Sequence, residues 1–131
     1  MVIDTSAIMA ILLDEPEARP LSLALEADLK RWMSAATFVE LGIVASVRGR
    51  GGLADVERLM AEAGIEIIPV TAEHARLALQ GYERFGKGRH AAGLNFGDCF
   101  SYALAQASQE PLLFKGVDFA QTDVVAVTLP A

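Results

Sequence analysis

Short apolar runs along the chain alternate with longer stretches in which apolar residues recur every three or four positions. The short runs predict β-strands and the longer stretches predict helices. The predicted strands cover residues 1–4, 31–34, 65–70, 111–114 and 124–127. The predicted helices cover residues 6–13, 16–29, 38–50, 53–63, 71–85 and 95–109. Because helices separate nearly all the strands, the pattern predicts an α/β fold with helices on both faces of a parallel sheet.

Local residue preferences mark several helix ends. Ser6 and Thr37 are suitable N-caps for the first and third helices, and Pro16 suits the first turn of the second. Thr71 is expected to open the helix that runs to residue 85. Gly51-Gly52 is expected to end the third helix, so that it forms a helical hairpin with the next.

Length and composition narrow the class of protein. A chain of 131 residues suits a single domain spanning 1–131, and 53% apolar residues allow a sizeable core. The net charge of −6 argues against a protein that coats nucleic acid by bulk attraction. The single cysteine, Cys99, fits a reducing compartment. No apolar run approaches the roughly 18 residues of a membrane span and no leader is evident, so we expect a soluble, cytoplasmic protein.

Two acidic residues follow predicted strands directly or closely. Asp4 ends the first strand, and Asp118 lies four residues after Phe114, where a later strand ends. A buried charge is costly unless something pairs with it or binds it. Ligands of parallel sheets bind beyond the carboxyl ends of the strands. Both acids therefore fall where an active site is expected.

Two further acids lie in unusual helical positions. Glu40 shares a helical face with apolar residues, which are Ile43, Val44 and Val47. Asp98 lies in the first turn of its helix, where the helix dipole alone favours a carboxylate. Its neighbours can also form hydrogen bonds, which suits a polar pocket; they are Asn95, Ser101 and Tyr102. For Asp98 both explanations stay open.

Four carboxylates at one edge of a sheet would repel one another and raise their pKa values unless cations were present. Hard divalent ions that prefer oxygen ligands, Mg²⁺ or Mn²⁺, meet this need. His74 and His90 show no spacing typical of zinc ligands. The sequence therefore predicts a Mg²⁺ site, open to Mn²⁺ as a substitute, that performs phosphate chemistry.

Three other motifs match only in part. Residues 81–88 fit the start of a phosphate-binding loop, but Gly88 replaces the required Ser or Thr and a helix precedes them. Residues 86–91 resemble a dinucleotide-binding turn without its leading strand. Asp4-Thr5-Ser6 lacks the second Asp that phosphatases with an aspartate nucleophile carry at the position of Ser6. We reject the first two and regard the third as weak.

Four segments in this order resemble the PIN-domain family, and within it the VapC-type ribonuclease toxins of bacterial type II toxin–antitoxin pairs. They are MVIDTSA, TFVE, LNFGDCFSYALA and LLFKGVDFAQTD, and the similarity covers essentially the whole chain. The resemblance implies a PIN-like three-layer sandwich. It also implies an acidic catalytic set formed by Asp4, Glu40, Asp98 and Asp118.

The resemblance assigns roles within this set. Asp4 and Asp98 would be the principal metal ligands, Glu40 would hold water or act as a base, and Asp118 would complete the cluster. Supporting positions fall on Thr5, Ser6 and Asp123. Many relatives carry a polar residue where this chain has Val117, which argues against a fully ligated second metal.

The implied activity is Mg²⁺-dependent endonucleolytic hydrolysis of RNA, in which the ion lowers the pKa of a water that it binds. Basic residues near the acids would position the RNA phosphates, namely Arg84, Lys87, Arg89 and Lys115. An inactive PIN-like binding module and a DNA-directed nuclease remain alternatives. The implied partners are a cognate antitoxin and a second copy of the chain. We expect the homodimer to use surplus apolar residues of the short elements, such as Ile8, Ile11, Leu12 and Trp32.

Overall fold

A sheet of four parallel strands in the order β3-β2-β1-β4 forms the centre of the computed structural model, which describes residues 1–49 and 51–130. The strands are β1 Val2–Ile3, β2 Trp32–Ser34, β3 Glu66–Ile68 and β4 Leu112–Leu113. The helices are α1 Thr5–Leu12, α2 Ala18–Ala27, α3 Ala35–Arg48, α4 Gly52–Ala63, α5 Ala72–Phe85 and α6 Phe96–Ser108, with a 3₁₀ turn η1 at Phe119–Gln121.

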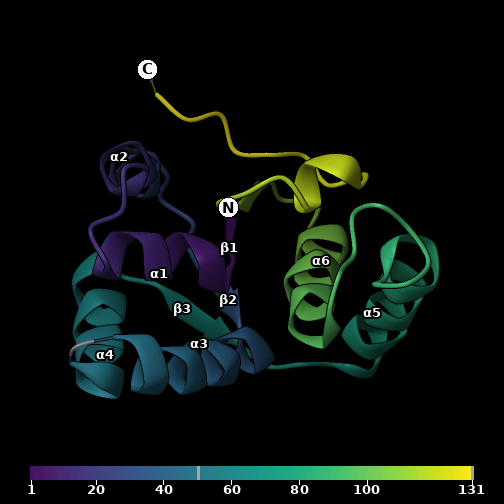
Figure 1. Ribbon diagram of the computed structural model, residues 1–131, viewed down its shortest axis with the longest axis horizontal. Coiled ribbons are helices and arrows are strands. Elements are labelled where there is room, and N and C mark those ends of the chain that lie inside the picture. The colour runs from purple at the N-terminus through teal and green to yellow at the C-terminus, as the bar shows by residue number, and fades with distance from the viewer. Residues whose placement is uncertain (50, 131) are drawn as a thin grey trace.

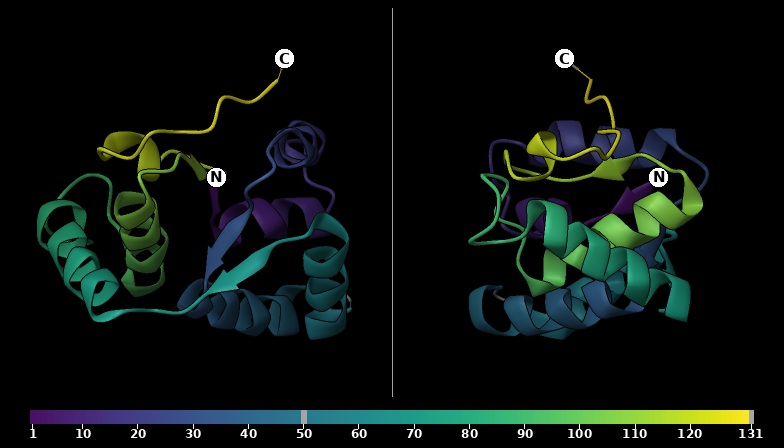
Figure 2. Two further views of the ribbon diagram at one scale, coloured as in Figure 1. Left: turned by 180° about the vertical axis from the view of Figure 1, so that it is seen from behind. Right: turned by 90° about the vertical axis from the view of Figure 1, so that its right-hand side faces the viewer.

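Helices cover both faces of this sheet. Helices α1 to α4 lie on one side and α5 and α6 on the other, which is plain from three directions (Figures 1 and 2). The predicted α/β three-layer sandwich is therefore confirmed. No helix in the described part of the chain is both long enough and apolar enough to cross a membrane.

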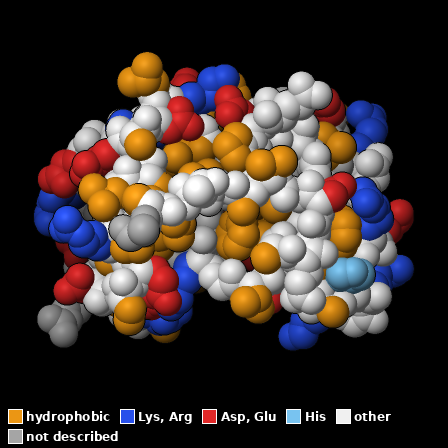
Figure 3. Space-filling model, turned by 90° about the horizontal axis from the view of Figure 1, so that it is seen from above, with side chains coloured by type: hydrophobic (Ala, Val, Ile, Leu, Met, Phe, Trp, Pro, Cys, Tyr) orange, Lys and Arg blue, Asp and Glu red, His pale blue; other side chains and the backbone are white. Residues whose placement is uncertain are grey.

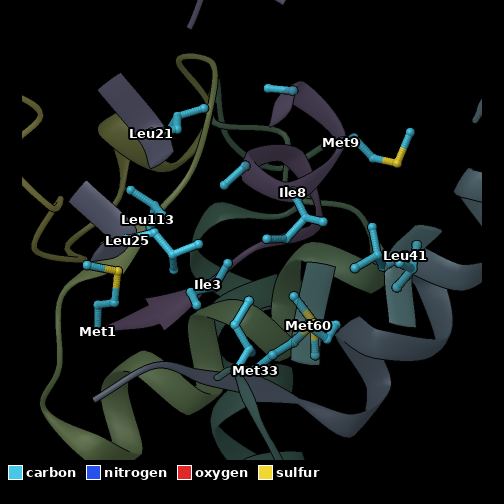
Figure 4. Close-up of a cluster of buried hydrophobic side chains, with 14 of the residues drawn as sticks. Met1, Ile3, Ile8, Met9, Leu21, Leu25, Met33, Leu41, Met60 and Leu113 are labelled. Carbon is cyan, nitrogen blue, oxygen red and sulfur yellow. The ribbon is translucent and has the colours of Figure 1, made fainter. Parts of the chain in front are cut away.

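Strand residues alternate between the two cores because successive side chains of a strand point to opposite faces. Val2 is paired with Leu112 and belongs to the core under α5 and α6. Ile3 is paired with Leu113, and both belong to the core under α1 to α4. In that second core, Ile3 and Met33 of the sheet face Ile8 and side chains from the surrounding helices (Figure 4). Two adjacent buried residues thus fix β1 between two helical layers.

Two predicted N-caps are wrong by one turn or less. Asp4, not Ser6, caps α1, because Asp4 already has the extended backbone of a cap and its Oδ2 accepts from the N–H of Ser6 at 3.0 Å. Ser34, not Thr37, caps α3 and accepts from the N–H of Ala36 at 3.3 Å. Both caps lie directly at the end of a strand, so each strand passes into its helix without a loop.

Two other helix ends also differ from the prediction. Helix α2 begins at Ala18 rather than at Pro16, because the N–H of Ala18 bonds to the carbonyl of Glu15 and closes a separate turn first. The third helix ends at Arg48, and Arg50, the predicted end, lies outside the described residues. By contrast, Thr71 caps α5 as predicted.

The predicted final strand over residues 124–127 is wrong. Only Ala126 forms a bridge to the sheet, to Leu112, because β4 has just two residues and offers little edge to pair with. The segment instead runs over the face that carries α2, where hydrophobic side chains gather near the centre and charged ones lie mainly toward the rim (Figure 3). A hollow of about 280 Å³ remains there, lined by residues that include Leu21, Phe114 and Leu129.

The apolar residues expected to form a dimer surface are needed by the core instead. Ile8 is fully buried, and Ile11 and Leu12 are half-buried against the same core. Trp32 packs on the core under α5 and α6. A different set of apolar side chains points outward from α3, which follows the lower margin in Figures 1 and 2. We call this set the α3 face; it consists of Val39, Ile43 and Val47, which are 57%, 61% and 80% exposed.

Candidate active site

Asp4 lies at the carboxyl end of β1, next to the point where the sheet order changes direction between β1 and β4. The residue is only 3% exposed. Oδ2 accepts two hydrogen bonds from Ser6, from the N–H at 3.0 Å and from Oγ at 2.7 Å. The capping bonds and the positive end of α1 therefore stabilise a carboxylate in a buried position.

Glu40 reaches the same region from the second turn of α3. Its Oε1 accepts from the hydroxyl of Thr5 at 2.6 Å. Burial raises the pKa of Glu40, the bond from Thr5 lowers it in part, and the charge of Asp4 raises it again. The carboxylate lies against Gly97 of α6, where any Cβ would overlap it. Glu40 therefore occupies space that only a glycine at residue 97 leaves open.

Asp98 caps α6 together with Asn95. Asn95 Oδ1 accepts from the N–H of Asp98 at 2.9 Å, and Asp98 Oδ2 accepts from the N–H of Asn95 at 3.0 Å. Burial raises the pKa of Asp98 to about 6, and the charges of Asp4, Glu40 and Asp118 contribute in the same direction. Asp98 thus caps the helix in whose first turn a carboxylate is favoured, and the charges of three other carboxylates also act on it.

Asp118 approaches from the loop after β4. The loop turns at Gly116, whose φ of +105° is unfavourable for other residues. It is anchored by Phe119, which is 3% exposed and packs on Phe114 with ring centroids 5.4 Å apart. Asp118 itself is exposed between these two fixed points. The loop therefore holds its carboxylate near Asp98 without burying it.

The four acids fit a hydrated divalent ion better than a dehydrated one. No Lys, Arg or His of residues 1–49 and 51–130 forms a salt bridge with any of them, so their negative charge has no protein counter-charge there. Within the same residues, no three Asp, Glu, His or Cys side chains are arranged to enclose one ion. Mg²⁺ usually keeps several waters and needs only one or two carboxylates together with phosphate oxygens. The oxygen-only donor set of this site meets that requirement.

Two buried hydroxyl groups, of Ser101 and Thr37, lie behind Asp4 in addition to the residues predicted from the sequence. Ser101 donates to Asp4 Oδ1 at 2.5 Å, and Thr37 Oγ1 lies 3.2 Å from Ser101 Oγ. The sequence marks Ser101 only as a polar neighbour of Asp98, and nothing in it connects Ser101 to Asp4, 97 residues away. For Thr37 the sequence predicts a helix cap instead.

Asp123 is not brought to the four acids. Its carboxylate accepts from Arg84 Nη1 at 3.0 Å and from Gln106 Nε2 at 2.9 Å. Gln106 lies eight residues after Asp98 on α6, which corresponds to about 12 Å along the helix. Asp123 therefore ties the C-terminal loop to α5 and α6 and neutralises Arg84.

The remaining basic candidates divide into two kinds. Lys115 Nζ is paired with Glu15 and lies 3.7 Å from Glu17, so its charge is largely balanced. Lys87 and Arg89 form no salt bridge within the described residues, and Arg89 lies over the ring of Tyr82 at 5.6 Å. Of the four basic candidates, Lys87 and Arg89 are thus the two whose charge no described acid balances.

Comparisons with known proteins agree with the predicted family. The family model described as PIN domain matches residues 1–125. The protein named Ribonuclease VapC30 from Mycobacterium tuberculosis is 48% identical over an alignment of 131 positions, which covers 99% of this chain and 100% of the relative. Two solved structures share the fold. One is VapC20 from Mycobacterium tuberculosis, described as a Sarcin-Ricin loop cleaving toxin, with a TM-score of 0.75, 16% identity and 98% of each chain covered.

The second solved structure with this fold is a toxin–antitoxin complex from Klebsiella pneumoniae. Its TM-score is 0.68 and its identity 21%, and the match covers 95% of this chain and 94% of that one. The match to the family model spans nearly the whole chain, and the identity to VapC30 is far above what shared fold alone produces. The resemblance seen in the four sequence segments is thereby confirmed, and this chain belongs to the PIN domain family as a member of VapC type.

Proposed function

We propose that this protein is a Mg²⁺-dependent endoribonuclease and the toxin of a type II toxin–antitoxin pair. The observation that carries the proposal is Asp98, a half-buried carboxyl whose pKa is raised to about 6 by its burial and by three further acids. A group of like charges without a basic partner is stabilised by a cation. The 48% identity to a protein named a ribonuclease supports RNA as the substrate.

In this reaction a water oxygen forms a bond to phosphorus, one ester P–O bond breaks, and the departing oxygen gains a proton. Bound Mg²⁺ would supply the charge neutralisation and Lewis acidity that phosphate hydrolysis requires. Asp4 and Asp98 would hold the ion. Glu40 has Oε1 engaged by Thr5, so its Oε2 accepts the proton of the attacking water. Lys87 and Arg89, whose charges no described acid balances, contact the phosphates of the bound RNA.

Cleavage of labelled RNA by the purified chain tests this proposal. We expect cleavage in Mg²⁺, none in EDTA, and recovery with Mn²⁺. A DNA strand of the same sequence distinguishes the DNA-directed alternative, which predicts the opposite preference. Glu62→Gln, which removes an exposed acid of α4, is the control and should cleave normally. Full RNA cleavage in EDTA would contradict the metal requirement, and no cleavage of either strand would support an inactive binding module.

We propose two protein partners. The first is a cognate antitoxin, because a protein of this fold is found in a toxin–antitoxin complex. If a small DNA-binding protein is encoded beside this chain, coexpression of the two should yield a complex and suppress RNA cleavage. If that protein neither binds nor inhibits the chain, the toxin role is wrong even where the nuclease activity holds.

The second partner is another copy of this chain, docked on the α3 face. A hollow of about 240 Å³ beside this face extends to Phe96 and Phe100 of α6. These two rings also border a hollow of about 590 Å³ between α5 and α6, which is lined mainly by apolar side chains. Apolar surface this continuous is typical of a protein interface, and a two-fold axis lets one patch cover its own copy.

A further inference from the structure

A chain of buried hydroxyls leads from α3 through α6 to Asp4. Thr37 and Ser101 are both 0% exposed. Ser101 Oγ donates to Asp4 Oδ1 at 2.5 Å, and the hydroxyls of Thr37 and Ser101 are 3.2 Å apart. Ser101 has a single hydroxyl proton, and it donates that proton in the hydrogen bond to Asp4. Thr37 must therefore be the donor to Ser101, so all the protons in this chain point toward the carboxylate.

The donors around Asp4 leave one oxygen better placed than the other to bind an ion. Each carboxylate oxygen has two lone pairs. At Oδ2 both are taken by the N–H and the hydroxyl of Ser6. At Oδ1 the bond from Ser101 takes one and leaves one. Ser101 thus decides in which direction the remaining lone pair of Asp4 points.

Ser101 also connects the two expected metal ligands. It lies three residues after Asp98 on α6, so the two side chains share a helical face. Its bond to Asp4 crosses from that helix to the end of β1. The separation of Asp4 and Asp98 is therefore fixed by a buried contact between their own elements rather than by the exposed surface.

We propose that Ser101, supported by Thr37, is a positioning residue that directs Oδ1 of Asp4 toward Asp98 and thereby sets the affinity of the site for its divalent ion. The proposal rests on the metal-dependent function proposed above. Donors to metal-binding carboxylates commonly matter in this way, and removing one typically weakens metal binding or activity on the order of 10- to 100-fold. A bond that served folding alone would leave the metal affinity unchanged.

Mn²⁺ binding, measured by titration calorimetry on the full chain, tests the proposal. Ser101→Ala should bind Mn²⁺ on the order of 10-fold more weakly than the unmodified chain, and Ser101→Thr, which keeps the hydroxyl, should recover the affinity. Thr37→Val keeps the side-chain shape and should shift the affinity in the same direction by less. Ser108→Ala is the matched control, because Ser108 lies on the same helix but donates to the carbonyl of Leu104. Its Mn²⁺ affinity should not change.

RNA cleavage at increasing Mn²⁺ gives a second readout. Excess Mn²⁺ should restore the cleavage rate of Ser101→Ala, whereas it should not restore that of Asp98→Asn, which lacks a ligand charge. Unchanged Mn²⁺ affinity in folded Ser101→Ala overturns the positioning role and leaves the proposed function intact. If that variant does not fold, unchanged affinity in Thr37→Val overturns it equally. An unmodified chain that binds no Mn²⁺ would remove the proposed function and this inference together.

Discussion

The hydroxyl of Thr5 donates to Glu40 Oε1 at 2.6 Å, although 35 residues separate them in the sequence. This bond joins the first residue of α1 to the second turn of α3. The next residue, Ser6, donates to Asp4, so two acids from distant segments are held by adjacent residues. Asp4 and Glu40 are therefore held by the hydroxyl groups of Thr5, Ser6 and Ser101, and several consequences can be measured.

Thr5→Val should make Glu40 a less effective general base without disturbing the fold. Valine has the shape of threonine but no hydroxyl, and the bond from Thr5 lowers the pKa of Glu40. Without it the pKa of Glu40 rises further, so the acidic limb of the pH–rate profile should move to higher pH. The rate at neutral pH should fall on the order of 10-fold. Thr5→Ser keeps the donor and serves as the control; an unmoved acidic limb in Thr5→Val would argue that Glu40 is not the base.

Gly97→Ala should displace Glu40. A Cβ at residue 97 would overlap the Glu40 carboxylate, which is the flexible end of its side chain and can move away. We expect little loss of stability, since Ala is favoured over Gly in a helix. The cleavage rate should fall by up to about 100-fold, as when a reacting group is misplaced by 1 Å.

Gly42→Ala is the control for that change. It lies on α3 near Glu40, and its Cβ would meet only Leu53 Cδ1 at an ordinary 3.5 Å. Its melting temperature should stay equal or rise, and its cleavage rate should not change. If Gly97→Ala cleaves RNA as fast as Gly42→Ala, Glu40 has no part in the reaction.

Ile43→Lys should separate the proposed homodimer. Ile43 is 61% exposed at the middle of the α3 face, where a second copy would bury the new charge. Light scattering should give a dimer mass for the unmodified chain and a monomer mass for the variant. Leu29→Lys, at a fully exposed leucine outside this face, should remain dimeric. A monomer mass for the unmodified chain at every concentration would rule out the pairing.

Elements with strong local preferences could be predicted from the sequence. Helix α5 has its cap at Thr71 and its end at Phe85, because the capping residue and the apolar periodicity agree there. Asn95 and Asp98 likewise form the capping box that begins α6. In contrast, two hydroxyl residues near the start of α3 are equally good caps by local rules. Ser34 takes that role because the strand ends there, and Thr37 is left inside the helix.

The acids could be found from sequence, but their surroundings could not. Asp4 and Glu40 stand out because each interrupts an apolar pattern, and Asp98 stands out because its neighbours are polar. Ser101 looks like an ordinary helical serine until α6 packs beside β1 and brings it to Asp4. The opposite error concerns Asp123, which the family resemblance placed among the supporting positions of the site. The turn η1 lies between them, and Arg84 and Gln106 hold Asp123 elsewhere.

Asp98→Asn separates a metal ligand from a structural helix cap. Asparagine keeps an oxygen that can accept the N–H of Asn95, but it carries no charge. In Mg²⁺ the cleavage rate should fall on the order of 100-fold, as when one electrostatic stabiliser is removed. A carboxylate that served the helix alone would leave cleavage intact, and its loss would cost about 0.3–1 kcal/mol of stability.

The pH dependence of melting in EDTA shows whether Asp98 stabilises or destabilises the metal-free fold. The pKa of Asp98 is about 6 in the folded chain, above its ordinary 3.8, so the folded state binds the proton more tightly than the unfolded state. Asp98 therefore destabilises the metal-free fold progressively as pH rises from about 4 to about 6, and no further above that range. Asparagine does not titrate. The melting temperature of Asp98→Asn should match that of the unmodified chain near pH 4 and exceed it above pH 6. Addition of Mg²⁺ at pH 7 should reverse this order of melting temperatures. The unmodified chain binds the ion more tightly than Asp98→Asn, and tighter binding stabilises the folded state more. If Asp98→Asn melts lower than the unmodified chain at pH 7 in EDTA and cleaves RNA normally, Asp98 is a helix cap and nothing more.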